Sequence, residues 1–164
     1  MLISLPSATI RSRGSRTSGA EHRAVTTLAR IVAGLTLLAA PGAAGATCSV
    51  SPQSVSFGAY DPLSPSALDG VGNVNVACDA PTNFTVSLDS GNGTVEDRRM
   101  TGGPADLDYN LYKESARVII WGEAAAGVSS SGTNVDLPVY GRIPGGQNVP
   151  ANIYADSVTV TVAF

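Results

Sequence analysis

The chain has 164 residues, of which 43% are hydrophobic, 5% aromatic and 14% charged, and its formal net charge is −3. This length suits a single domain, and the excess of acidic over basic residues excludes the basic surface typical of nucleic-acid-binding proteins.

The N-terminal residues have the pattern of a secretory signal peptide. An arginine-rich region precedes an apolar run, Ile31–Ala40. A transmembrane span needs about 20 apolar residues, so this run is too short to anchor the processed chain. Ala44-Gly45-Ala46 then supplies the small residues of a cleavage site. A buried N-terminal helix is disfavoured because no amphipathic period follows. We predict a signal peptide over residues 1–46, cut before Thr47, and a mature domain over residues 47–164.

Both cysteines, Cys48 and Cys78, lie in the mature domain. An even number of cysteines in an exported chain favours a disulfide, which here would close a loop of about 30 residues. A metal site is the competing interpretation, but two cysteines need further ligands, and the one histidine, His22, leaves with the signal peptide. We therefore expect a Cys48–Cys78 disulfide and no metal or other cofactor.

Cleavage would also change the charge and the available chemistry. Five basic and twelve acidic residues remain after residue 46, so the net charge becomes 5 − 12 = −7. Without a histidine or a free cysteine, the domain lacks the groups of Ser-His or Cys-His catalysis. We expect a domain that is not an enzyme and that binds no nucleic acid.

Apolar residues after Ala46 alternate with polar ones, and clusters of Gly, Pro, Asn, Asp and Ser interrupt them. This pattern predicts short β-strands joined by turns, as in an all-β sandwich or barrel. The predicted strands span residues 49–57, 71–78, 84–88, 107–112, 118–121, 137–143 and 154–164.

The last predicted strand, Tyr154–Phe164, has the clearest alternation. One face carries the larger side chains and one acid, and the other face carries small residues. The residues of the first face are Tyr154, Asp156, Val158, Val160, Val162 and Phe164. A strand of such high β-propensity is expected to be fully used in the fold.

Acidic pairs elsewhere fit surface roles better than chemistry. Asp106 and Asp108 would share a strand face, as metal or acid–base pairs must, and Glu96 is followed by Asp97. Asp106 and Asp108 follow Gly-Gly-Pro at a strand edge, where charges discourage edge-to-edge pairing. We expect solvated charges here, with weak calcium binding as the alternative.

Three other features are expected to have structural rather than ligand-binding roles. The Asp89–Gly93 segment resembles a calcium loop but lacks the closing glutamate, so we predict a hairpin turn. Arg98 and Arg99 are expected to be a surface pair near a loop rather than an anion site. Trp121 is expected in the core or at its rim rather than as a platform for sugars.

Motifs along the mature domain, taken together, resemble the spore coat protein U domain family, which includes subunits of archaic chaperone–usher pili. Cys48 begins the domain, and Cys78 ends a strand. The matching segments are Gly72–Cys78, Phe84–Asp89, Arg98–Met100, Leu107–Tyr112, Pro138–Pro144 and Tyr154–Phe164. Each is weak alone, but their order is specific, and the resemblance covers essentially all of the mature domain.

The resemblance implies an incomplete immunoglobulin-like β-sandwich that lacks its last strand. A groove along the final strand then exposes the core. A periplasmic chaperone fills this groove during export, and the N-terminal extension of a neighbouring pilus subunit then replaces the chaperone. An outer-membrane usher is the third partner that the resemblance implies. By analogy, the pairing strand would use Val158, Val160, Val162 and Phe164. The residue pattern agrees, because an unpaired apolar edge aggregates unless a partner strand is added.

One departure from the family matters for function. Polymerising subunits carry a donor strand ahead of the first cysteine, whereas only Thr47 lies between the predicted cut and Cys48. We therefore expect an acceptor-only subunit, structural or adhesive, at a terminal or capping position of a surface pilus. It would pass through the periplasm and keep no membrane anchor. The alternative is a self-complete secreted domain that binds carbohydrate or metal, in which a segment such as Val118–Trp121 covers the last strand.

Overall fold

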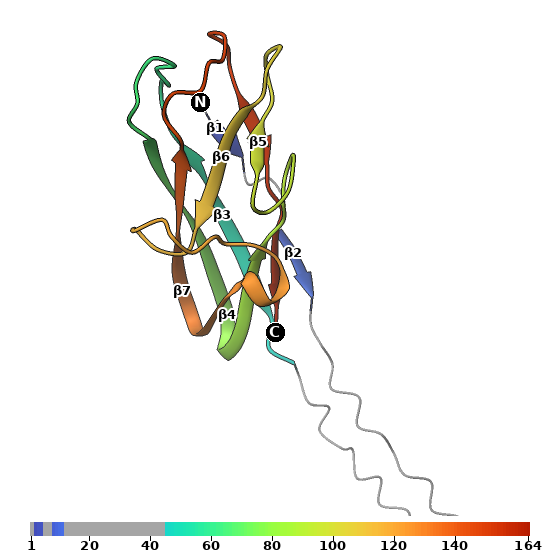
Figure 1. Cartoon of the computed structure of the whole chain (residues 1–164). Coiled ribbons are helices and arrows are strands. Elements are labelled where there is room, and N and C mark those ends of the chain that lie inside the picture. The colour runs from blue at the N-terminus through green and yellow to red at the C-terminus, as the bar shows by residue number, and fades with distance from the viewer. Residues whose placement is uncertain (1, 5–7, 12–44) are drawn as a thin grey trace, which may run out of the picture. The chain divides into compact units, whose positions relative to one another are not determined.

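The computed structural model describes residues 2–4, 8–11 and 45–164, which form strands, loops and one short 3₁₀ turn, η1 (Ala124–Ala126) (Figure 1). The strands are β1 (Leu2–Ser4), β2 (Ala8–Arg11), β3 (Cys48–Ser56), β4 (Leu68–Leu88), β5 (Arg98–Met100), β6 (Leu107–Tyr112), β7 (Val128–Ile143), β8 (Ala155–Ser157) and β9 (Val160–Ala163). The all-β prediction is confirmed. In this described part, no helix has the length and apolar character needed to cross a membrane.

β4 is the longest strand and connects the two parts of the sheet. Its first half pairs with β3 and with the C-terminal half of β7, and its second half pairs with β9 and with the N-terminal half of β7. The register shifts between Ala77 and Thr82. The sequence predicted two strands here, 71–78 and 84–88, with a break between them. This break is wrong, because β4 continues through residues 79–83. Pro81 has no N–H to donate, and it lies at the register shift, where no ladder hydrogen bond is required of it.

The strands curl around one core. Pairing follows the order β5-β6-β7-β4-β3-β1-β8, while β9 pairs with β4 and β2. A bridge between Thr101, next to β5, and Ala155 of β8 brings the two ends of this order together. The inward apolar side chains of β3 to β7 and of β9 therefore meet in a single cluster, which includes Val55, Val74, Val86 and Leu111.

β7 begins well before the predicted strand at 137–143. The serine-rich stretch after Val128 continues the strand, because residues 128–132 pair with residues 82–86 of β4. Serines and glycine show no alternation in hydropathy, so the sequence placed this stretch in a loop. The short strand β5 was missed for the related reason that three residues are too few to show a period.

Residues 118–121 do not form the predicted strand. Val118 and Ile119 are 75% and 58% exposed, and both of their backbone N–H groups donate to Glu114 Oε1, at 2.7 and 2.9 Å. The segment pairs with the end of β6 and the residue after it only through an isolated bridge between Tyr112 and Ile120, which is too short to form a strand. Trp121 returns to the core, as expected, and its indole nitrogen donates to the carbonyl of Val86 at 2.9 Å.

Candidate functional site

A groove between β3 and the C-terminal strands β8 and β9 holds the first strands of the chain. β1 pairs antiparallel with β3, at Val55 and Ser56, and parallel with the whole of β8. β2 pairs parallel with the whole of β9, and Figure 1 shows it beside the C-terminal end. Among residues 45–164, no strand pairs with this edge of β8 or β9. Among the residues that the structure describes, the strands that cover the groove are therefore β1 and β2.

The side chains predicted to line a pairing strand lie along this groove on the core side. Val158, Val160 and Val162 are fully buried, and Phe164 is partly buried against the same cluster. The four share one face of the C-terminal segment, as the alternation in the sequence indicated. The segment is divided into β8 and β9 rather than forming one strand, since Val158 and Thr159 lie outside both.

The opposite wall of the groove is built by the end of β3. Val55 is fully buried, and the ring of Phe57 packs edge-on against Tyr109, with ring centroids 6.4 Å apart. Gly141 of β7 allows this packing, because a Cβ at that position would lie 2.5 Å from Phe57 Cζ. The absence of a side chain at residue 141 thus sets how closely the wall approaches β7.

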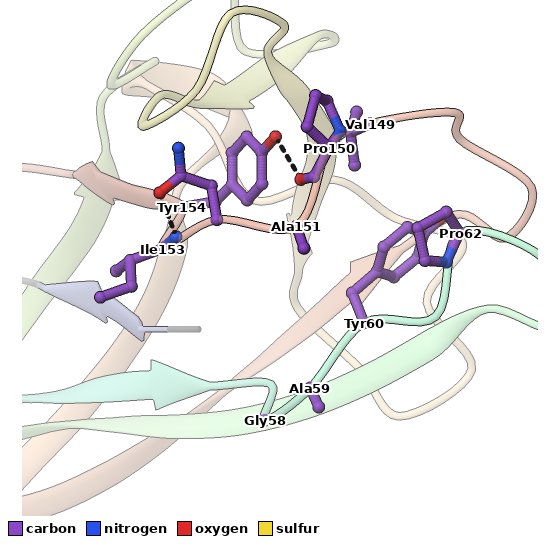
Figure 2. A pocket seen from close by; sticks show the side chains of 10 residues that line it. Gly58, Ala59, Tyr60, Pro62, Val149, Pro150, Ala151, Ile153 and Tyr154 are labelled. Atoms are coloured by element: carbon purple, nitrogen blue, oxygen red, sulfur yellow. Dashed lines mark hydrogen bonds between the residues drawn. The ribbon is translucent and has the colours of Figure 1, made fainter.

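A pocket of about 360 Å³ continues the line of the groove beyond β1 (Figure 2). The chain that leaves β3, from Gly58 to Pro62, forms one side, and the chain that enters β8, from Val149 to Tyr154, forms the other. The Tyr154 hydroxyl donates to the carbonyl of Pro150 at 2.9 Å, and Ile153 at the rim is 82% exposed. The lining is mostly apolar, so an extended chain in the groove could place one more apolar side chain here.

Asp156 of β8 is buried beside the groove and organises the turn that follows β4. Its carboxylate accepts hydrogen bonds from the Tyr109 hydroxyl at 2.6 Å, the Asn92 side chain at 2.8 Å and the Ser157 backbone at 2.7 Å. Burial raises the pKa of Asp156 above its ordinary value, and these hydrogen bonds oppose the rise. Burial, then the bond to Asp156, also raises the pKa of Tyr109. The two side chains thus tie β8 to β6 and to the turn after β4.

The prediction that Arg98 and Arg99 form a surface pair is wrong for Arg98. Its side chain is fully buried, whereas that of Arg99 is 51% exposed. The Arg98 guanidinium donates to the carbonyls of Asp89 at 2.6 Å and Trp121 at 2.9 Å, and to Asn110 Oδ1 at 2.7 Å. Desolvation lowers its pKa. These partners occupy the guanidinium internally, so it is not an anion site.

The segment Asp89–Gly93 forms a turn but not the predicted hairpin. β4, before the turn, pairs with β3, β7 and β9, whereas β5, after it, pairs with β6. Asp89 Oδ1 accepts from the backbone nitrogens of Gly91 and Thr159, at 3.0 and 2.9 Å. The acid thus ties the turn to the start of β9 and is not arranged as part of a calcium loop.

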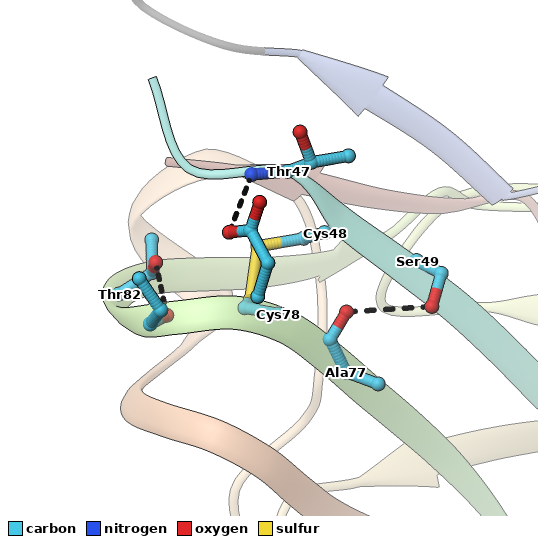
Figure 3. The surroundings of a disulfide bond; sticks show 8 residues. Thr47, Cys48, Ser49, Ala77, Cys78 and Thr82 are labelled. Carbon is cyan, nitrogen blue, oxygen red and sulfur yellow. Dashed lines mark hydrogen bonds between the residues drawn. A yellow bond between two sulfur atoms is a disulfide. The ribbon is translucent and has the colours of Figure 1, made fainter. Parts of the chain in front are cut away.

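The disulfide between Cys48 and Cys78 is present, as predicted (Figure 3). The two cysteines lie directly opposite each other on β3 and β4, with Cα atoms 4.0 Å apart. The bond therefore fastens the first residue of β3, the strand that forms one wall of the groove.

Acidic residues elsewhere lie at the surface. Asp106 and Asp108 are exposed, and Asp108 lies 3.5 Å from the Arg99 side chain. Glu96 and Asp97 are exposed as well. Within residues 45–164, no three histidine, cysteine or acidic side chains come together as metal ligands would.

Comparison with known proteins gives consistent results. The model of the Spore Coat Protein U domain matches residues 33–161. Protein U of Myxococcus xanthus is 31% identical over 141 residues, which cover 73% of this chain and 79% of that protein. The predicted family resemblance is thereby confirmed.

A solved structure shares the fold. It is the CsuC–CsuE chaperone–tip adhesion subunit pre-assembly complex from archaic chaperone-usher Csu pili of Acinetobacter baumannii, with a TM-score of 0.54 and 24% identity. The match covers 73% of this chain and 40% of the matched chain, so this chain spans less than half of that protein. The immunoglobulin-like, incomplete sandwich predicted from the sequence agrees with this fold. The chain belongs to the Spore Coat Protein U domain family.

Proposed function

We propose that the processed chain is an exported structural or adhesive subunit of a chaperone–usher surface pilus, which accepts a partner's strand into the groove between β3 and β8–β9. The observation that supports this most directly is the strand pairing at that edge. Residues 45–164 supply no strand for it, although buried valines of β9 lie directly beneath. No step of this function requires catalysis or a cofactor.

The physical argument concerns what happens when residues 1–46 are removed. Both β1 and β2 would leave with them, so β3, β8 and β9 would each have unpaired backbone groups along an apolar core. Such an edge pairs with any available strand and aggregates unless it is covered. An added strand supplies main-chain hydrogen bonds, and its alternate side chains pack against the core. The proposed partners are a periplasmic chaperone, then an outer-membrane usher and a neighbouring subunit.

Val158, Val160, Val162 and Phe164 are the side chains that we propose contact the incoming strand. The pocket beyond β1 would receive one further apolar side chain at the end of that strand. The structure of a chaperone–tip subunit complex with a similar fold supports a chaperone as the first occupant.

The position in the fibre depends on where cleavage occurs. A cut before Thr47 leaves one residue before Cys48, so the subunit would accept a strand without donating one, as in a terminal or capping position. Two observations favour other outcomes. The family match begins at residue 33, inside the predicted signal peptide, and a chain that kept residues 2–11 would fill its own groove.

The N-terminal sequence of the exported protein separates these outcomes. A start at Thr47 supports the acceptor-only subunit. A start near residue 33 would contradict it and indicate a donor segment, and retention of residues 2–11 would indicate a self-complete secreted domain.

The C-terminal residue offers a test of the groove itself. Phe164→Ala removes an apolar side chain at the end of the proposed pairing face, and we expect it to weaken binding of the chaperone about tenfold or more, because burying such a ring is worth about 1.5–3 kcal/mol. Ala163→Ser changes the neighbouring, exposed residue and is the matched control. The measurement is the yield of one-to-one complex after co-expression and the dissociation constant of the purified complex. Equal binding by both variants, or a stable monomer that needs no partner, contradicts the proposal.

A further inference from the structure

Asp79 of β4 binds the first residue of the predicted mature domain, Thr47, which Figure 3 shows beside the disulfide. The backbone nitrogen of Thr47 donates a hydrogen bond of 2.9 Å to Asp79 Oδ1, and the Asp79 nitrogen donates one of 3.0 Å to the Thr47 carbonyl. The next residue, Cys48, is bonded to Cys78. Thr47 is therefore fixed to β4 by two hydrogen bonds and an adjacent disulfide, which is more than a chain end normally has.

The chemical nature of the Thr47 nitrogen changes when the chain is cut. In the precursor it is a neutral amide. Hydrolysis of the Ala46–Thr47 bond by water leaves Ala46 as a carboxylate and Thr47 with a free α-amino group, which is protonated below a pKa of about 7.7–8.0. The same nitrogen would then face the same carboxylate as a cation, and charge-assisted hydrogen bonds are shorter and stronger than neutral ones.

We propose that Asp79 is a binding site for this α-ammonium group, so that removal of the signal peptide completes an ion pair that closes the amino end of β3. The inference rests on cleavage before Thr47, and it does not depend on the function of the domain in a fibre.

The other charged residues on the neighbouring strands have partners of their own, so Asp79 is the carboxylate that faces the Thr47 nitrogen. β3 carries no charged residue, β4 carries Asp69 and Asp79, and β7 carries Asp136 and Arg142. Asp69 and Arg142 pair with each other at 2.8 Å, and Asp136 accepts hydrogen bonds from asparagines of β4. Arg11 of β2, a strand that contacts β3, leaves with the signal peptide.

The side of β3 on which the ion pair lies has a consequence for the groove. β3 pairs with β4 along one edge and with β1 along the other, and Asp79 belongs to the β4 side. The free amino end is therefore held on the edge of β3 that faces away from the groove. A strand that enters the groove would not compete with the chain's own first residue.

The test measures the reactivity of this amine as a function of pH. The full precursor is exported, and the purified product, with its chaperone if one is bound, is acetylated briefly with acetic anhydride between about pH 6 and pH 10, a range that spans the ordinary α-amino pKa. Peptide mass spectrometry then quantifies the label. The mature domain contains one lysine, Lys113, which serves as an internal control between the folded samples. The comparisons are wild type, Asp79→Asn, and wild type unfolded in urea.

An exposed ion pair predicts a modest but specific effect. Near neutral pH the Thr47 amine should react about two- to fivefold more slowly in the folded wild type than in Asp79→Asn or in urea, a factor set by the usual strength of exposed pairs. The difference from Asp79→Asn should disappear at the highest pH, where the amine is neutral, whereas steric shielding would persist.

Several results would overturn the inference. They are identical pH profiles for the folded and unfolded wild type, a difference that is independent of pH, or an exported chain that starts at another residue. The wild-type comparison decides the question even if Asp79→Asn does not fold. Failure to bind a chaperone would bear on the proposed function alone.

Discussion

Two charged side chains, Arg98 and Asp156, are buried in the described part of the chain, and each is held by hydrogen bonds rather than by an opposite charge. The partners of Arg98 are carbonyl and amide oxygens from the end of β4, from β6 and from the segment at Trp121. The sequence shows two adjacent arginines and cannot tell which one turns inward, because its partners are backbone atoms distant along the chain. Alternation placed Asp156 on the same face as Val158 and Val160, and in the structure all three are buried.

Replacing the buried guanidinium should be costly even when the charge is kept. Arg98→Lys retains the charge but has too few, differently placed donors, so buried carbonyls lose their partners, and we expect a loss of more than about 2 kcal/mol in the free energy of unfolding. Arg99→Lys, at the exposed neighbour, should change it by less than about 0.5 kcal/mol. The measurement is urea unfolding of the domain with a donor strand tethered in its groove. Similar losses for the two variants would show that Arg98 is not the buried anchor.

Tyr109→Phe removes the hydroxyl that donates to Asp156 and should give a pH-dependent loss of stability. This bond lowers the pKa of Asp156 against the effect of burial, so its removal raises that pKa further. A carboxyl with a raised pKa in the folded state loses stability as the pH rises through that value, so the deficit should be about 1–3 kcal/mol near pH 7 and smaller near pH 3. The same unfolding assay at both pH values measures it. A deficit that grows at low pH would contradict the assignment.

At the level of strands, alternation predicted best where apolar side chains were frequent. The segments 49–57, 107–112 and 154–164 were located close to β3, β6 and the β8–β9 pair. The long strands β4 and β7 were underestimated because polar stretches without alternation, such as residues 129–132 of β7, pair with residues 82–85 of β4, and that pairing is set by tertiary structure. The run at 118–121 shows the opposite error, since these apolar residues make only an isolated bridge to Tyr112, and Val118 and Ile119 remain exposed.

The disulfide between β3 and β4 should contribute a large share of the stability of this small domain. Replacing both Cys48 and Cys78 by alanine opens a loop with a sequence separation of 30 residues, and we expect a loss of about 3–4 kcal/mol. Ser49→Ala, at the exposed next position of β3, is the control and should cost less than about 1 kcal/mol. Unfolding of the strand-complemented domain measures both. A loss below about 1 kcal/mol for the cysteine pair would show that the ladder between β3 and β4 holds without it.

At the scale of the whole molecule, composition and alternation predicted the fold class. The expectation that the sandwich lacks its last strand came from the family resemblance. The sequence alone also placed the buried valines of the C-terminal strand. It did not reveal the pocket beyond β1, because that pocket is formed by two loops that meet only when the strands curl around the core. The turn at Asp89–Gly93 was recognised as a turn, but its connection to β9 depends on the same long-range arrangement.

The central claim is that residues 47–164 leave the groove between β3 and β8–β9 open until a partner fills it. The most direct measurement is hydrogen–deuterium exchange at Val160–Ala163 of the exported chain, in complex with its chaperone and again after the chaperone is removed. We predict strong protection in the complex, followed by fast exchange or aggregation when the partner leaves. Equal protection in a stable, partner-free monomer that starts at Thr47 would contradict the claim.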